Sequence, residues 1–347
     1  MPDRMHDVIV AGGGPAGLAV ALGCARAGMD VVVCEKRSGV LDKACGEGLM
    51  PGAVRALTAL GVAPAGHPIE GITYQQGSLV AHAPFRSGTG LGVRRTQLHD
   101  ALRAAVARAG VPVLTLPVTD VLQYDDHVRA GALRARYLVA ADGLHSSIRD
   151  LVGLTENAGR GTASAPRWGQ RRHFELSPIS SAVEVTWAPK SEAYVTPVAP
   201  DTIGVAILSS VRGGFTEQLL AFPELAARLA GARPVSGVRG AGPLRQRATG
   251  RVAGRVLLAG DAAGYVDALT GEGLALSLST AADLVRCLRA GRPAAYERAW
   301  TRTSRRSRWL TESLLWARNR PALGRRIVPA AARAPWLFAA AVDQLAR

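Results

Sequence analysis

A glycine-rich turn at residues 12–17, with the sequence GGGPAG, constrains the fold of this chain more than any other feature. It follows an apolar, β-branched run at residues 8–10 and precedes a helix-forming run at residues 18–27. A second apolar run at residues 31–34 predicts a second strand, and Glu35 is the last residue of that strand. A strand, a glycine-rich turn, a helix and a second strand that ends in a carboxylate are typical of a dinucleotide-binding βαβ unit.

Each glycine of the turn has a separate task in such a unit. Gly12 permits the tight turn, Gly14 lets the backbone approach a pyrophosphate, and Gly17 lets the helix pack closely on the strand. The diphosphate then lies at a helix N-terminus, among free amide groups and the positive end of the helix dipole. The ligand contacts expected here are Gly12, Gly14, Pro15, Ala16, Gly17, Glu35 and Lys36.

Two later motifs indicate which dinucleotide binds. Residues 140–149 contain Asp142-Gly143, and residues 255–264 contain Gly260-Asp261 after an apolar strand. Together with the first turn they resemble the para-hydroxybenzoate hydroxylase-type superfamily of FAD enzymes, over about residues 5–300. The resemblance implies that Asp142-Gly143 supports the flavin pyrophosphate and the approach of a nicotinamide, and that Asp261 binds the ribityl chain. NAD dehydrogenases lack the late Gly-Asp motif, so the expected cofactor is FAD, with NAD(P)H as a transient reductant.

The same resemblance implies further cofactor contacts. A helix expected over residues 274–288 would point its N-terminus at the pyrimidine end of the flavin, where amide donors stabilise negative charge. Of Arg94 and Arg95, the spacing to Leu98 favours Arg95 as the residue that contacts FAD. The further contacts expected are Cys45, Gly46, Arg95, Val118, Gly143, Gly260, Gly271, Glu272, Gly273 and Leu274.

The segment at residues 43–52, KACGEGLMPG, corresponds to a stretch that runs beside the flavin ring in the superfamily. Flavin halogenases carry a similar segment followed by an essential lysine, but no lysine occurs here between Lys43 and Lys190. Halogenation is therefore not expected. Cys45-Gly46-Glu47 is instead similar to geranylgeranyl reductase-type enzymes, and Cys45 and Tyr194 are the candidate catalytic side chains, although the flavin itself carries the chemistry.

Chain organisation predicts an α/β fold: a Rossmann-type FAD-binding domain related to glutathione reductase, an inserted antiparallel β-sheet, and C-terminal helices. Strand-like runs at 182–187, 193–197 and 202–208 alternate with turns, and Trp187, Tyr194 and Phe174 are expected on one face, as pocket lining or core. The expected division is 1–70, 91–165 and 240–295 for the FAD-binding domain, 71–90 and 166–239 for the substrate domain, and 296–347 for the C-terminal helical region.

Composition narrows the class of protein. The chain has 347 residues, 48% of them apolar, and four cysteines without metal-like spacing, which favours a reduced cytoplasmic protein. The net charge of +15 comes almost wholly from arginine, and no nucleic-acid-binding module accompanies it, so a nucleic-acid partner is not expected. No apolar run is long enough to span a bilayer.

Arginines dominate the region that follows residue 296. Ten arginines and a single acid, Glu312, lie between Arg298 and Arg333. Trp309 and Trp316 are seven residues apart, which places them on one helical face. We expect this helix to pack its tryptophans on the FAD-binding domain; the alternative is a docking surface for an acidic carrier protein that holds a tethered substrate, or for an anionic membrane.

The favoured function is an FAD-dependent, NAD(P)H-using monooxygenase that hydroxylates or epoxidises an aromatic, polyketide or other secondary metabolite through a flavin C4a-hydroperoxide. The alternative is a reductase that saturates an isoprenoid or polyketide double bond. A non-redox cyclase or isomerase that needs reduced flavin, and a flavoprotein without turnover, also remain open. His145 and His173 are the nearest candidates for a base, and both are more typical of structural histidines.

Overall fold

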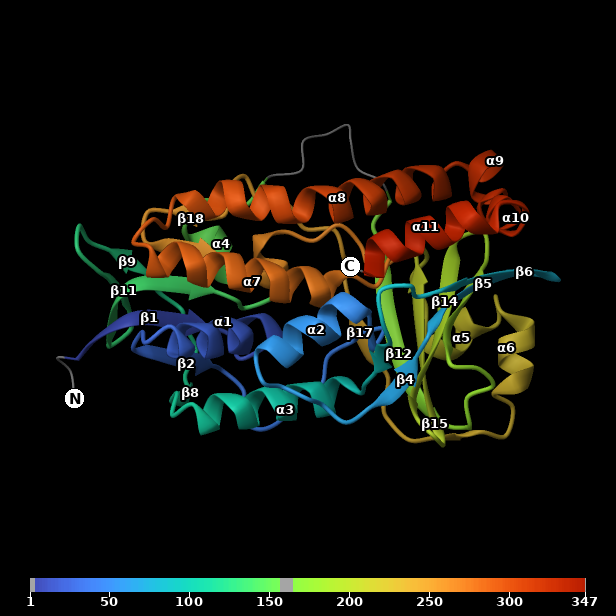
Figure 1. Cartoon of the computed structure of the whole chain (residues 1–347), viewed down its shortest axis with the longest axis horizontal. Coiled ribbons are helices and arrows are strands. Elements are labelled where there is room, and N and C mark those ends of the chain that lie inside the picture. The colour runs from blue at the N-terminus through green and yellow to red at the C-terminus, as the bar shows by residue number, and fades with distance from the viewer. Residues whose placement is uncertain (1–3, 157–164, 347) are drawn as a thin grey trace.

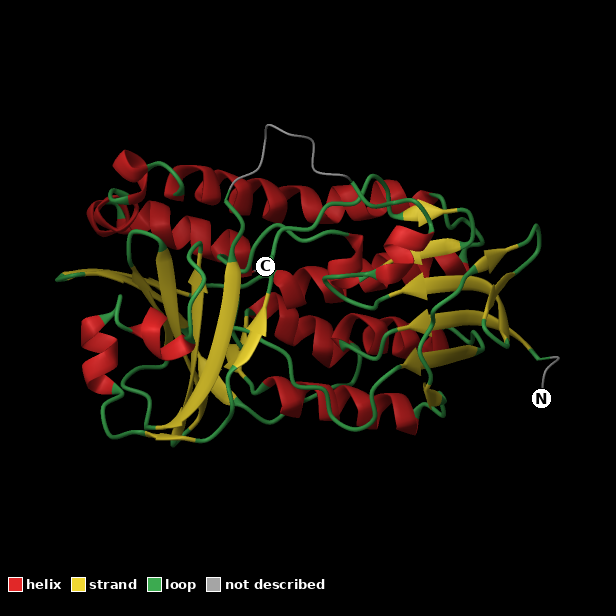
Figure 2. Ribbon diagram, turned by 180° about the vertical axis from the view of Figure 1, so that it is seen from behind, coloured by secondary structure: helices red, strands yellow, loops and turns green. Residues whose placement is uncertain are grey.

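Two β-sheets lie at opposite ends of the molecule, and helices lie between and above them (Figure 1). The computed structural model describes residues 4–156 and 165–346. The helices α1, α3 and α7 cover one side of the first sheet, and α8 runs above both sheets along the length of the molecule (Figures 1 and 2). The domain boundaries given above stay a proposal, and residues 157–164 lie outside the described part.

The first sheet has a parallel centre, as expected for a dinucleotide-binding unit. Its order is β18-β19-β11-β1-β2-β8, and β9 and β10 extend β11 as antiparallel additions. Four pairs, β19-β11, β11-β1, β1-β2 and β2-β8, are parallel. The strands are β1 (Met5–Ala11), β2 (Val31–Glu35), β8 (Val113–Thr115), β9 (Leu122–Gln123), β10 (Val128–Ala130), β11 (Leu133–Ala140), β18 (Val252–Ala253) and β19 (Val256–Leu258).

The helices around this sheet bury apolar faces against it. In α1 the apolar residues fill almost the whole helix, because it packs between the sheet, α3 and α7. α8 then covers α7 on its outer side (Figure 1). The elements are α1 (Pro15–Arg26), α2 (Pro51–Ala59), α3 (Arg95–Arg108), α4 (Ser147–Leu151), the 3-10 turn η1 (Gly260–Ala263), α7 (Gly273–Arg289) and α8 (Ala295–Arg318).

The second sheet has the order β16-β12-β15-β14-β13-β5-β6, with β17 also on β12. Its pairs are antiparallel except β5-β13, because β5 comes from a distant part of the chain and is not the hairpin neighbour of β13. A small sheet, β3-β7-β4, lies beside it. The strands are β3 (Gly48–Leu49), β4 (His67–Ile69), β5 (Gly71–Gln76), β6 (Leu79–Pro84), β7 (Gly90–Gly92), β12 (Trp168–Glu175), β13 (Ala182–Trp187), β14 (Ser191–Ala199), β15 (Thr202–Ser209), β16 (Arg233–Pro234) and β17 (Arg239–Ala241).

The two faces of this sheet have different neighbours. Phe174 packs in an apolar cluster with α5 (Phe215–Leu219) and α6 (Pro223–Arg228). Trp187 belongs to a separate cluster, against which Tyr194 packs, together with residues of the C-terminal helices. The expectation that all three aromatic side chains share one face is therefore wrong for Phe174, which alternates with His173 along β12.

The C-terminal helices return along α8 after a turn at one end of the molecule (Figure 1). They are α9 (Pro321–Gly324), α10 (Ile327–Arg333) and α11 (Pro335–Ala346), and α10 and α11 pack on β6. The expectation that Trp309 and Trp316 pack inward is wrong, since the two side chains are 66% and 55% exposed. The buried side of α8 carries Trp300 instead, and nine residues at 100° each place Trp309 opposite Trp300.

Candidate functional site: an FAD cleft and the loop beside it

The glycine-rich turn between β1 and α1 is a backbone cradle. A Cβ on Gly12 would lie 2.3 Å from the Ala141 carbonyl oxygen, and one on Gly17 would lie 1.9 Å from the Gly12 carbonyl oxygen. Gly14, by contrast, faces open space, with no atom within 4 Å of its Cβ position. Gly14 is also the N-cap of α1 and offers no side chain to the first amides of that helix. Those amides are therefore available to an anion.

Glu35 fixes one end of the cleft. Its Oε2 accepts a hydrogen bond from the Gly13 amide (2.8 Å), and its Oε1 accepts bonds from the amide and Nε of Arg37 (3.1 Å each). Burial alone would raise the pKa of Glu35, but these hydrogen bonds outweigh it and lower the pKa, so the carboxylate is ionised at neutral pH. A cavity opens here, lined by Gly13, Glu35, Arg37 and the β8 residues 113–115 among others. A ribose hydroxyl would find an acceptor in this cavity.

The middle of the cleft gathers charged side chains from three distant segments. Lys43 lies within electrostatic reach of Asp261, Glu35 and Arg95, and its Nζ lies 3.2 Å from where a Cβ on Gly143 would stand. Burial lowers the pKa of Lys43 and raises the pKa of Asp261. The Nε of Arg95 is buried without a hydrogen-bond partner among the described residues. These cations are placed to meet the phosphates of a dinucleotide.

Parallel pairing brings the three sequence motifs together. Ala11, at the end of β1, is level with Ala140 at the end of β11, and Ala140 is level with Leu258 at the end of β19. Asp142 and Gly260 each follow these ends after one intervening alanine. A Cβ on Gly260 would lie 2.6 Å from the Cβ of Ala16, so the third motif packs on the glycine-rich turn. The carboxyl ends of parallel strands, where open α/β sheets bind ligands, thus carry all three motifs.

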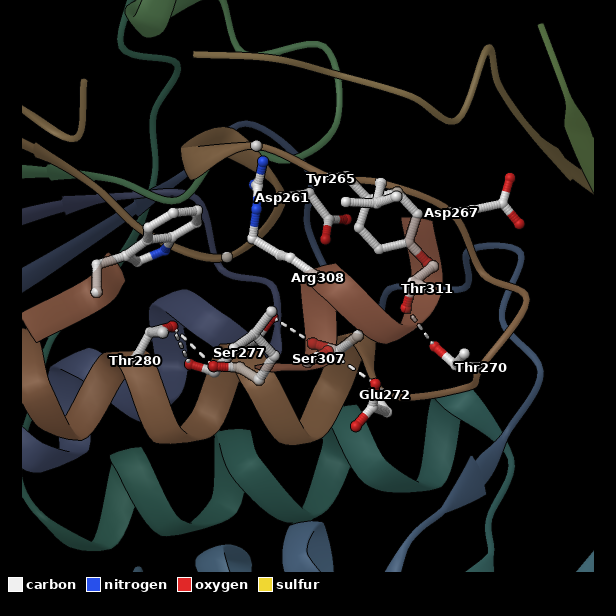
Figure 3. A pocket seen from close by; sticks show the side chains of 16 residues that line it. Asp261, Tyr265, Asp267, Thr270, Glu272, Ser277, Thr280, Ser307, Arg308 and Thr311 are labelled. Carbon is white, nitrogen blue, oxygen red and sulfur yellow. Dashed lines mark hydrogen bonds between the residues drawn. The ribbon is translucent and has the colours of Figure 1, made fainter. Parts of the chain in front are cut away.

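The segment after η1 leads to the N-terminus of α7 and borders a cavity between α7 and α8 (Figure 3). Glu272 is the N-cap of α7, and Gly273 and Leu274 begin the helix. The hydroxyl of Ser307 on α8 donates to Oε2 of Glu272 (2.7 Å), and Thr270 and Thr311 share a hydrogen bond (2.9 Å). Burial raises the pKa of Glu272 to about 7. Its side chain does not cap the amides of α7, which remain available to a ligand.

Glu47 connects the cleft to the second sheet. Its Oε1 accepts from the amide of Arg95 at the start of α3 (2.8 Å), and its Oε2 lies 2.6 Å from Nε2 of His173 on β12. Arg171, also on β12, lies 3.6 Å from the same carboxylate and forms an ion pair with Asp42. Glu47 is the only non-glycine residue with a positive φ (61°) in the described ranges. Strain of this kind persists where surrounding contacts hold it, and it clusters at functional sites.

Two side chains that can donate a proton, the Cys45 thiol and the Tyr265 hydroxyl, lie within electrostatic reach of each other in this part of the cleft. Cys45 accepts a weak hydrogen bond at Sγ from the amide of Glu47 (3.4 Å), and burial raises the pKa of its thiol. Tyr265 follows η1, lines the cavity of Figure 3 and lies within electrostatic reach of Cys45. Burial, reinforced by Asp261 and Asp267, raises the pKa of its hydroxyl. Both groups are therefore protonated at neutral pH.

Tyr194 lies in a different part of the site from Cys45. Its hydroxyl donates to the Leu269 carbonyl (2.9 Å), and it stands beside a buried charge cluster in which Arg167 contacts Glu192 (2.5 Å) and Asp267 (3.2 Å). Arg318 of α8 also forms an ion pair with Glu192. The cluster joins β14 to α8, and Tyr194 forms part of that joint. Its proposed catalytic role stays a prediction.

Other predicted residues are placed less centrally. Lys36 is exposed and lines neither cavity, whereas its neighbour Arg37 does line the cavity at Glu35. Val118 lies in the loop between β8 and β9, outside both cavities. His145 is exposed, while His173 is buried against Glu47.

The sequence interpretation missed four residues that the structure brings to the site. Glu47 carried a signal in the motif at residues 43–52, and His173 was considered only as a candidate base, so the sequence did not indicate that the two pair. Lys43 belongs to the same segment and is one of only three lysines in the chain. Tyr265 directly follows the third motif. Arg171 gave no signal, because its role depends on the pairing of β12 with β15 and not on local sequence.

These features fit FAD. The open space at Gly14, the unpartnered Nε of Arg95 and the uncapped amides of α1 and α7 can take a diphosphate and a flavin ring, and Glu35 can take the ribose.

Sequence comparisons agree with this geometry. Residues 5–171 match the FAD binding domain family. The chain is 28% identical to a menaquinone reductase of Mycolicibacterium smegmatis, over 85% of this chain and 79% of that protein. It is 28% identical to a digeranylgeranylglycerophospholipid reductase of Methanothermobacter thermautotrophicus, over 77% of this chain and 73% of that protein. A 3-hydroxybenzoate 6-hydroxylase of Aquipseudomonas alcaligenes is 32% identical over 43% of each chain.

Among solved structures, a flavin-dependent brominase superposes with a TM-score of 0.80 at 16% identity, covering 99% of this chain and 94% of that one. This likeness shows the fold alone. The expected resemblance is confirmed: the chain carries an FAD binding domain and is an FAD-dependent oxidoreductase.

Proposed function

We propose that this FAD-dependent oxidoreductase saturates a carbon–carbon double bond in an apolar, isoprenoid-like substrate, with NAD(P)H as the source of electrons. The observation that carries the proposal is the position of Cys45, whose Sγ accepts from the amide of the strained residue Glu47 and lies within electrostatic reach of the Tyr265 hydroxyl. Two relatives that match most of the chain, named as reductases of menaquinone and of a digeranylgeranyl lipid, support it.

Saturating a double bond requires a hydride and a proton. Bound FAD supplies the hydride chemistry. The Sγ of Cys45 or the hydroxyl of Tyr265 can give the proton to the other substrate carbon, because burial keeps both groups protonated. Glu47 and His173 hold the loop that carries Cys45 in place, and the Thr196 hydroxyl fixes it further by donating to the Gly46 carbonyl (2.8 Å).

An apolar cluster adjoins this loop and would suit a hydrocarbon chain. Met50, at the end of the loop segment, and Val266 and Leu269, after η1, belong to the same cluster as Val183 and Trp187 of β13. These side chains pack against one another with at most 9% of each exposed, so an isoprenoid unit would displace some of them and bury its own apolar surface in their place.

The second candidate is the monooxygenase favoured by the sequence interpretation. The 32% identity to a hydroxylase over 43% of the chain supports it. In that case the apolar cluster would limit the access of water to the bound cofactor, and the product would gain an oxygen atom instead of two hydrogens.

One experiment separates the two candidates. The purified protein, reduced under anaerobic conditions, is mixed with a polyprenyl quinone or a geranylgeranyl lipid, and products are identified by mass spectrometry. The proposal predicts a gain of two hydrogens without oxygen. We expect Cys45→Ala to slow this step by about 100-fold while FAD content is kept, and Cys287→Ala, which lies on α7 away from the loop, to leave it unchanged. A product that gains oxygen, formed only in air, would instead support the monooxygenase.

A further inference from the structure

The outer face of α8 exposes large apolar side chains that nothing in the described ranges covers. Trp309 and Trp316 are 66% and 55% exposed, although tryptophan is normally highly buried. Just beyond the helix, Trp336 and Leu337 at the start of α11 are 68% and 53% exposed. The C-terminal end of α8 and the start of α11 lie at the same end of the molecule, joined by α9 and α10 (Figure 1). Exposed apolar groups gathered in this way mark an interaction site.

Arginines occupy the same face of α8. At 100° per residue, the exposed residues of this face fall within an arc of about 100°. The guanidinium of Arg320 also stacks on the ring of Trp316 (3.7 Å). The only acid between residues 298 and 333, Glu312, pairs with Arg245 (3.2 Å). We call this stripe the Trp–Arg face; it consists of Arg302, Arg305, Arg306, Trp309 and Trp316 on α8, with Arg320 just beyond the end of the helix.

We propose that the Trp–Arg face docks this protein on the surface of an anionic lipid bilayer. Tryptophan favours the boundary between headgroups and acyl chains, and arginine attracts anionic headgroups. A basic helix face with aromatic residues lies in the plane of such an interface. No helix in the described ranges is long and apolar enough to cross a membrane, so the contact is peripheral.

The apolar cluster beneath this face continues toward the site. Leu315 of α8, Val328 of α10 and Phe338 of α11 belong to the same cluster as Met50 and Val266. A long-chain substrate taken from the bilayer would reach the loop that carries Cys45 only by parting these packed side chains. This last step rests on the proposed function, whereas the docking itself depends only on the surface.

Vesicle sedimentation tests the docking without turnover. The FAD-loaded protein is mixed with phosphatidylcholine vesicles that contain about 30% phosphatidylglycerol, and with pure phosphatidylcholine vesicles, at low and high salt. We expect binding to the anionic vesicles, weakened by salt, and a blue shift of tryptophan emission. Trp309→Ala combined with Trp316→Ala should weaken binding at least about tenfold, and Arg305→Gln with Arg306→Gln should do the same at low salt.

A matched control removes exposed apolar groups elsewhere. Ile179 and Leu220, each 73% exposed, lie at the second sheet, and their double alanine variant should bind like the parent protein. The proposal is overturned if the parent protein does not bind anionic vesicles at low salt, or if the tryptophan variant binds equally well. Capture by an acidic carrier protein with no vesicle binding would also overturn it. If the parent protein binds the vesicles but does not reduce the polyprenyl or geranylgeranyl substrate, only the proposed function is contradicted.

Discussion

The two ends of the FAD cleft are built by opposite means. At the Glu35 end, the ligand-facing groups are backbone amides of one tight turn and a single carboxylate, and residues 12–35 supply most of them. At the Glu47 end, buried charged side chains from a loop, a helix start and β12 hold each other in place. The first end therefore depends on the absence of side chains, and the second depends on their presence.

This difference separates binding from chemistry. In a turn built from backbone groups, most substitutions are tolerated. The exception is the replacement of a glycine whose Cβ would meet another backbone segment. A cluster of buried charges tolerates few changes, because removing one partner leaves another buried and unpaired. Damage at the first end should show as lost FAD affinity, except where an added Cβ meets backbone and the fold itself suffers, and damage at the second as lost stability and turnover.

The largest loss of stability and of FAD binding is expected when Gly17 is replaced. A Cβ there would lie 1.9 Å from the Gly12 carbonyl oxygen, so Gly17→Ala should destabilise the fold by about 4 kcal/mol or more and abolish FAD content. Gly14→Ala is the matched control: its Cβ meets no protein atom, so the protein should fold normally and only bind FAD more weakly. Thermal unfolding and flavin absorbance measure both, and equal stability loss in the two variants would contradict the cradle.

The next effect compares the two ends directly. Glu47→Ala leaves His173 buried without its carboxylate and Arg171 with Asp42 as its remaining acidic partner, and should cost about 3 kcal/mol of unfolding free energy as well as turnover. Glu35→Ala should raise the Kd for FAD while turnover at saturating FAD stays near normal. Denaturant titration and FAD-saturated kinetics test this contrast, which fails if Glu35→Ala lowers the saturated rate as much as Glu47→Ala does.

A pH effect is expected at Glu272. Its pKa of about 7 lies above its ordinary value, so the folded protein holds a proton that the unfolded chain releases at lower pH. Stability should therefore fall as the pH rises from about 4.5 to 7, by about 3 kcal/mol. In Glu272→Gln this slope should disappear, and the variant should be the more stable protein at pH 8. Unfolding curves at pH 5 and pH 8 measure it, and an unchanged slope would exclude Glu272 as its source.

The smallest effect is expected at Lys43. Replacing it with methionine removes one cation from the middle of the cleft, so the Kd for FAD should rise by about tenfold. Lys190, on the turn between β13 and β14, is the control, and Lys190→Met should bind FAD normally. Equal affinities for the two variants, measured by fluorescence titration, would show that Lys43 does not meet the cofactor.

The sequence predicted the parts of this molecule whose signals are local. The β1–α1 turn, the strand that ends at Glu35 and the helix after Gly271 all lie where short-range patterns placed them. The inward packing of Trp309 was wrong because seven-residue spacing shows which residues share a face but not which way that face points.

The cluster around Glu47 could not be predicted in the same way. Arg171 and His173 are about 125 residues from Glu47, and only the register of β12 in the second sheet brings them to it. The pKa of Cys45 likewise depends on burial, which a single sequence does not report. Local chemistry was therefore accessible, and the contacts between the two sheets were not.

Because β1, β11 and β19 are neighbours in the sheet, the ligand-binding edge can form only late in the synthesis of the chain. β19 spans residues 256–258 of 347, so about three quarters of the chain must leave the ribosome before all three ligand-bearing strand ends can meet. Until then residues 138–140 of β11, which are apolar, form an unpaired stretch of sheet edge beyond the part that β10 covers, and such edges favour aggregation. Expression of this protein should therefore benefit from slow translation and from chaperones that shelter the growing chain.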